Sequence, residues 1–267
     1  MSAKRAKKSG AANRRVNSAA KPWFRKSWLD ILVLGTWSLT LFRYWVTGKL
    51  YLLLHPNYMW LANSAAIVLL AMAIFRVFQI RRSKKQQVQA PPSHTTLLPP
   101  QLSSLILLGV AVLGLIYTPQ VFASDTAIQR GVSESLTMTR SQPQRFVRQT
   151  ASEDRTVIDW IRTLNVYPEP DAYTGQSVKV SGFVIHPKEW PEEYLMLSRF
   201  VLTCCAADAY PVGLPVQLAV SRQAYAPDSW LDVEGKMVTA TIDGQRQLTI
   251  EPTQIETIPE PPNPYEY

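Results

Sequence analysis

The stretch SVKVSGFVIHP, residues 177–187, decides which fold is expected for the C-terminal half of the chain. Val178, Val180 and Val184 follow the alternation of a β-strand, and Gly182 among them predicts a bulge or bend. A strand that bends at a glycine is typical of the strongly curved first strand of a small β-barrel. We therefore expect an all-β domain built around this strand.

Four more strands are expected downstream, at YLMLSRFVLTCC, LPVQLAV, WLDVEGKMVTATI and RQLTIEPTQIETI. Asp243 and Gly244 separate the last two, and Asp-Gly between strand patterns is a strong hairpin signal. Five short strands predict a small OB-like β-barrel over residues 151–258, with a β-sandwich as the alternative. Residues 259–267 are expected to be a Pro-rich tail.

A short amphipathic helix is predicted to flank the barrel at residues 152–164, SEDRTVIDWIRTL. Its apolar side chains fall on one helical stripe, and Ser, Glu and Asp at its start suit a helix N-terminus. The stripe consists of Val157, Ile158, Ile161 and Leu164. We expect it to pack on the β-domain.

The charge is divided unevenly between the two halves of the chain. Residues 1–149 contain 20 Lys and Arg against 3 Asp and Glu, whereas residues 150–267 contain 8 against 17. The overall net charge of +8 therefore describes neither half. This asymmetry indicates a basic, membrane-anchoring half followed by an acidic domain.

Three apolar stretches predict a membrane domain over residues 28–118. They lie at about residues 28–45, 58–80 and 102–118, each near the length that crosses a bilayer. The basic tail, residues 1–27, and the RRSKK segment after the second stretch are expected to stay in the cytoplasm. Three crossings would then carry the β-domain to the extracytoplasmic side. Residues 119–150 are expected to be a linker, unless cleavage after Ala123 releases the domain.

The only two cysteines of the chain are adjacent, within LSRFVLTCCAADAYPVG, residues 197–213. Neighbouring side chains on a strand point to opposite faces, so joint chemistry requires Cys204 and Cys205 to lie in a turn. We predict a strand-to-turn junction with at least one accessible thiol. Two alternatives stay open: a strained disulfide or redox pair, and plain core packing.

Metal binding is the more specific hypothesis for this segment. Cys204 and Cys205 offer two thiolates, Asp208 a carboxylate, and His186 an imidazole from the end of the first strand. Thiolate and imidazole ligands suit zinc, and thiolates also suit monovalent copper. The sequence carries no recognisable catalytic triad or phosphate loop, and the acidic β-domain argues against nucleic-acid binding. We therefore expect a non-enzymatic protein.

Several segments together resemble the YcgQ-like family of uncharacterised bacterial membrane proteins. They are TVIDWIRTL, YTGQSVKVSGFVIHP, SRFVLTCCAADAYPVG and WLDVEGKM. The resemblance implies a location in the bacterial plasma membrane, beside a multi-span permease, and in some members a link to zinc supply. It also implies a functional patch in which Arg199 and Pro211 join the cysteines and Asp208, through contact with a partner.

The sequence thus leads to two hypotheses of different classes. The first is an accessory subunit of a permease for metal, such as zinc, or for another small solute, held in the lipid bilayer and presenting the CCAADA patch to a metal or to the permease. The second is a membrane-anchored thiol-disulfide oxidoreductase or thiol-dependent enzyme. A depressed thiol pKa would favour the second hypothesis.

Overall fold

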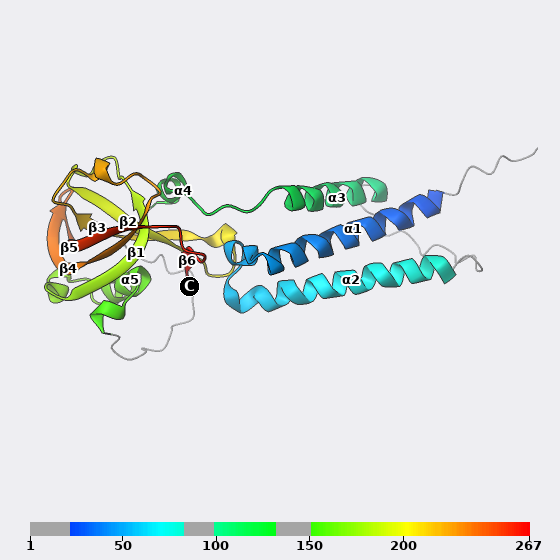
Figure 1. Ribbon diagram of the computed structural model, residues 1–267, viewed down its shortest axis with the longest axis horizontal. Coiled ribbons are helices and arrows are strands. Elements are labelled where there is room, and N and C mark those ends of the chain that lie inside the picture. Colours follow the sequence, from blue (N-terminus) through cyan, green and yellow to red (C-terminus); the bar gives the residue numbers. More distant parts are fainter. Residues whose placement is uncertain (1–21, 83–98, 132–150) are drawn as a thin grey trace, which may run out of the picture. The chain divides into compact units, whose positions relative to one another are not determined.

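The computed structural model describes residues 22–82, 99–131 and 151–267 (Figure 1). Most of the predicted basic tail and linker therefore lies outside the described residues. The chain divides into two compact units. The first contains the described residues up to Leu41 together with Ala65–Ile116, and the second contains Phe42–Ser64 and Tyr117–Tyr267.

Three helices dominate the N-terminal half: α1 (Pro22–Val46), α2 (Met59–Arg82) and α3 (Pro100–Ile116). The prediction of three membrane spans is wrong. Among the described residues, one helix is long and apolar enough to cross a membrane, Pro56–Arg82, with a mean hydropathy of 2.0.

The other two helices fail for different physical reasons. Helix α1 contains the charged residues Asp30 and Arg43, which lower its hydropathy. It also packs against the other two helices through the buried Ser38 and Thr40. Their hydroxyls donate to backbone carbonyls of the neighbouring helices, at 2.8 Å to Ala66 in α2 and at 3.2 Å to Ala111 in α3. Helix α3 has only 17 residues, which gives a length of roughly 25 Å against about 30 Å of hydrocarbon.

The second unit contains a six-stranded mixed sheet with the order β1-β4-β5-β3-β2-β6 and an additional β1–β2 pairing. Its strands are β1 (Ser177–Ile185), β2 (Tyr194–Val201), β3 (Tyr210–Gln217), β4 (Trp230–Ile242), β5 (Gln245–Ile258) and β6 (Tyr265–Glu266). The β3–β5 and β2–β6 pairings are parallel. The predicted five-stranded OB-like barrel is therefore wrong, because the expected tail supplies a sixth strand and the sheet is mixed.

Individual elements of the β-domain follow their sequence patterns closely. The hairpin between β4 and β5 turns at Asp243 and Gly244, which both have positive φ angles, as a two-residue hairpin turn requires. Helix α5 (Val157–Val166) begins after Thr156, whose hydroxyl accepts from the Asp159 N–H in a capping box. The short 3-10 helix η4 (Ser152–Asp154) precedes it, where the predicted helix began.

Gly182 has a different role from the predicted bulge. Its pairing with Leu231 of β4 lies within an uninterrupted register, and a register shift occurs instead between β4 and β5, beside Glu234 and Gly235. A Cβ atom on Gly182 would meet the Ser198 carbonyl oxygen at 2.6 Å. Glycine is therefore needed here because the backbones of β1 and β2 approach closely.

Two buried clusters form the core of the second unit. The first lies under α5, which Figure 1 shows against the sheet, and includes Trp160 and Ile161 with side chains from all five long strands. The second centres on Phe183, Phe200 and Trp230, and takes Leu52 and Ala127 from outside the sheet. Ala127 belongs to α4 (Ser124–Gln129), a helix within the segment expected to be a linker.

Candidate metal centre

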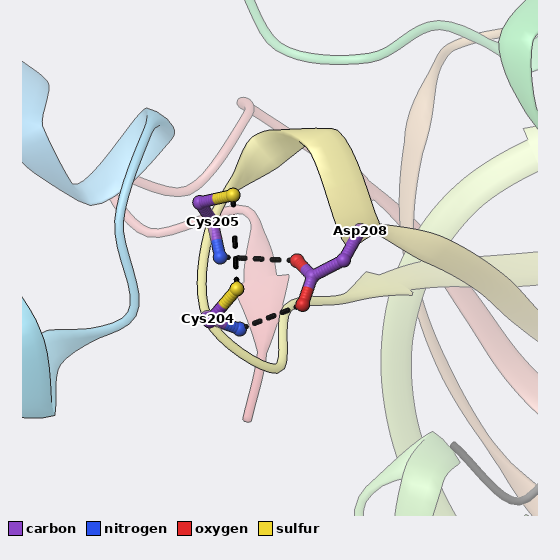
Figure 2. A group of neighbouring side chains, drawn as sticks. All are labelled: Cys204, Cys205 and Asp208. Carbon is purple, nitrogen blue, oxygen red and sulfur yellow. Dashed lines mark hydrogen bonds between the residues drawn. The ribbon is translucent and has the colours of Figure 1, made fainter. Parts of the chain in front are cut away.

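The two cysteines follow the end of β2 and precede a short 3-10 helix, η6 (Ala206–Asp208). The Asp208 carboxylate accepts hydrogen bonds from the backbone N–H groups of Cys204 at 2.8 Å and Cys205 at 3.0 Å. The Thr203 hydroxyl donates to the same carboxylate. Figure 2 shows the carboxylate facing both backbone nitrogens. The prediction of a strand-to-turn junction is thus confirmed, and Asp208 holds the turn closed.

Both thiols are available for chemistry in this turn. Cys204 and Cys205 are not joined by a disulfide; the Cys204 side chain is exposed and that of Cys205 is partly buried. Their Sγ atoms lie 3.7 Å apart. The two sulfurs and a carboxylate oxygen of Asp208 all lie within 4.8 Å of one another. This group could hold a metal ion.

The electrostatics of the turn favour a protonated Cys204 thiol when no metal is bound. Hydrogen bonding to the Asp208 carboxylate and to the Cys205 thiol raises the pKa of Cys204 to about 11. Burial opposes the charge of Asp208, but hydrogen bonds from the Thr203 hydroxyl and the backbone of the turn lower the pKa of Asp208 overall. The turn therefore combines an Asp208 carboxylate that stays ionised with a Cys204 thiol that stays protonated near neutral pH.

The cysteine turn also pairs with a distant segment of the same unit, just before the apolar helix Pro56–Arg82. Leu54 forms an antiparallel bridge with Cys205. The His55 N–H donates to the Cys204 carbonyl at 3.1 Å, and the Ala206 N–H donates to the Leu53 carbonyl at 2.9 Å. The sequence shows no signal for this pairing, since the partners lie far apart in the chain and neither segment forms a periodic strand.

His186 is not brought to the cysteines. It follows Ile185, which pairs with Met196 near the start of β2, whereas the cysteines lie beyond the other end of that strand. Val201 lies five positions after Met196, and at about 3.3 Å per residue this separates the two sites by more than about 15 Å. The group of neighbouring ligands among the described residues does not include His186.

Arg199 and Pro211, the two residues expected to contact a partner, lie inside the β-domain. The Arg199 side chain is 11% exposed and forms a 3.6 Å ion pair with Glu266, which is 10% exposed. Its guanidinium also lies over the Trp230 ring, 5.0 Å from the centroid. Pro211 is buried in β3 opposite Phe200. Both residues therefore pack between β2 and its neighbours, and their contact with a partner stays a prediction.

Comparisons with known proteins identify the family of the chain but no function. The DUF1980 N-terminal domain matches residues 29–133, and the DUF1980 C-terminal domain matches residues 141–267. No curated protein and no solved structure matches the chain. The first match contains most of α1 and all of α2 and α3, and the second contains the sheet and the cysteine turn. The chain thus consists largely of the two DUF1980 domains, which define a family without an assigned function.

Proposed function

We propose that this protein is a non-enzymatic membrane accessory subunit that binds zinc, or a similar thiophilic metal, for a permease. The observation that carries the proposal is the convergence of two thiols and a carboxylate within 4.8 Å on an accessible turn. Cys204 and Cys205 would supply thiolates, and Asp208 would supply a carboxylate oxygen. Zinc and monovalent copper are the metals that favour such sulfur-rich ligand sets.

The alternative function, a thiol-disulfide oxidoreductase, fits the turn less well. Thiols that attack disulfides have lowered pKa values, produced by nearby positive charge or a helix N-terminus. The nearest charge to Cys204 is the Asp208 carboxylate, and the pKa of Cys204 is raised to about 11. A thiol in this environment is a weak nucleophile near neutral pH, whereas a metal cation can displace its proton directly.

A membrane location is supported by the helix Pro56–Arg82. Arg81 and Arg82 lie in its last turn, and basic residues at the end of a span favour the cytoplasmic side. Because Leu54 pairs with Cys205, the cysteine turn shares a side with the start of this helix. We assign it to the extracytoplasmic side of a bacterial plasma membrane.

Zinc binding by the purified full-length protein tests the metal proposal. We expect about one zinc per chain after dialysis, and none in the Cys204→Ser/Cys205→Ser variant. Asp171→Asn, which removes an exposed carboxylate outside the group, is the matched control and should bind as the wild type does. A wild-type protein that retains no zinc and no copper would overturn the proposal.

The pH dependence of zinc affinity sharpens this test. Because the pKa of Cys204 is about 11, its thiol stays protonated near neutral pH and must lose that proton to bind. The zinc affinity should therefore rise by at least about tenfold per pH unit between about pH 6 and pH 8. An affinity that does not change with pH would show that the Cys204 thiolate is not a ligand.

The permease role is tested in cells. Cells that lack this chain should grow poorly when external zinc is chelated, and the wild-type chain should restore growth where the double serine variant does not.

Reporter fusions at Ser93 and Gln149 should report opposite sides of the membrane. Equal signals would overturn the extracytoplasmic side assigned to the cysteine turn.

A further inference from the structure

The group formed by Cys204, Cys205 and Asp208 supplies three ligands, whereas structural zinc sites almost always have four. Among the described histidines, His186 lies near the other end of β2. His55 is different, because its backbone N–H donates to the Cys204 carbonyl at 3.1 Å. The segment that pairs with the cysteine turn is therefore the candidate source of a fourth ligand.

The register of this pairing sets His55 opposite Cys204. Leu54 is bridged to Cys205, and hydrogen bonds run on both sides of that bridge, from His55 to Cys204 and from Ala206 to Leu53. Residues that face each other in an antiparallel pair have Cβ atoms about 5 Å apart. The imidazole of His55 and the thiol of Cys204 thus begin within reach of a shared ion.

In the present conformation the His55 ring is used elsewhere. Its Nδ1 accepts a hydrogen bond from the Asn57 N–H at 3.1 Å, which caps the 3-10 helix η2 (Pro56–Tyr58). The ring also packs edge-on against Tyr267, with centroids 4.8 Å apart. An Nδ1 that accepts a hydrogen bond leaves the proton on Nε2, and neither nitrogen can then bind a metal without breaking the cap.

We infer that His55 is the fourth ligand of the proposed metal site, and that it exchanges its cap on η2 for the metal. This inference rests on the proposed function. On binding, the two thiols release their protons to solvent and bind as thiolates, while the neutral imidazole donates a lone pair. The Asn57 N–H loses its acceptor at the same time. Metal occupancy is thereby linked to the first turn of the apolar helix that begins at Pro56.

The inference is tested on zinc-loaded full-length protein with two matched variants. Asn at a helix N-cap accepts a backbone N–H bond, so His55→Asn keeps a cap for η2 but removes the imidazole. His186→Asn removes the histidine that lies away from the turn. We expect the zinc affinity, from competition with a chelator, to fall by roughly tenfold or more in His55→Asn and to stay unchanged in His186→Asn.

X-ray absorption of the zinc-loaded wild type provides a measurement that does not depend on a variant folding. Two sulfur ligands and one imidazole are expected, and amide exchange at Asn57 should accelerate when zinc binds. A spectrum without imidazole, or His55→Asn binding as tightly as the wild type, would overturn the role of His55 alone. If the wild type binds no zinc, the proposed function fails first, so the two failures are distinguishable.

Discussion

Two carboxylates near the end of β2 show how differently one domain uses the same chemical group. Glu266 lies in the interior beside Arg199, and burial raises its pKa although Arg199 opposes the shift. Asp208 lies in the cysteine turn, where hydrogen bonds lower its pKa. The first carboxylate holds the fold together, and the second shapes an accessible site. The sequence alone does not reveal this difference. Arg199, which is the partner of Glu266, and Asp208 belong to the same CCAADA-containing stretch.

The largest effect is expected when the interior carboxylate is removed. Besides Arg199, Glu266 accepts hydrogen bonds from the Thr156 hydroxyl and the Ile158 N–H, both at 2.9 Å. Glu266→Ala leaves a buried guanidinium without its partner, which should lower the free energy of unfolding by about 3 kcal/mol. Thermal unfolding of the full-length protein measures the loss. Glu234→Ala, which breaks an exposed pair with Lys179, is the control and should change the melting temperature little.

A pH-dependent effect is expected when the interior cation is removed. In Arg199→Met, the attraction that opposes the raised pKa of Glu266 is lost, so that pKa should rise further. A raised pKa in the folded state gives stability at low pH that is lost as the pH rises through the folded-state value. The variant should therefore be most destabilised at neutral pH and should recover towards the wild type in mild acid. A loss of stability that is constant over this pH range would contradict the assignment.

Removing the carboxylate of the turn should change the free energy of unfolding less, and this change should depend on pH in the opposite direction. Asp208→Ala removes the acceptor that closes the turn, which should cost about 1 kcal/mol, as for other capping residues. Because the pKa of Asp208 is lowered in the folded protein, the wild type should lose this contribution as the pH falls through the folded-state value. The difference between wild type and variant should therefore narrow in acid, and a widening difference would contradict this role.

The smallest effect on the fold is expected from the thiols themselves. Cys204 is exposed and Cys205 partly buried, and serine nearly matches the size of cysteine. The Cys204→Ser/Cys205→Ser variant should melt at the wild-type temperature without metal, while zinc should stabilise only the wild type. If the double variant unfolds without metal, the cysteines are packing residues and the contrast with Glu266 disappears.

The sequence predicted the local elements of the β-domain well. The five long strands, the Asp243-Gly244 hairpin and the buried stripe of α5 all follow from side-chain periodicity and turn chemistry. The site also followed in part, because adjacent cysteines before Asp208 and a nearby proline favour a turn.

The rest depends on contacts that periodicity cannot reveal. Strand β6 has two residues and pairs in parallel with β2, so it carries no alternating pattern. The bridge from Leu54 to Cys205 joins segments of the two matched domains. The prediction of three spans was wrong because it considered apolar stretches alone, whereas α1 contains Asp30 and Arg43 and α3 has only 17 residues. The burial of Arg199 was not predicted for a similar reason, since its partner Glu266 lies in the segment expected to be a tail.

Strand β3 is attached very unequally along its two edges. All eight of its residues pair with β2, whereas it meets β5 only at Val216 and Ile250. Two of its residues, Pro211 and Pro215, have no N–H group to donate to either neighbour. Local opening of the sheet breaks the fewest hydrogen bonds where β3 meets β5. We therefore expect the sheet to part first between these strands, with β2, β3 and the cysteine turn moving as one piece.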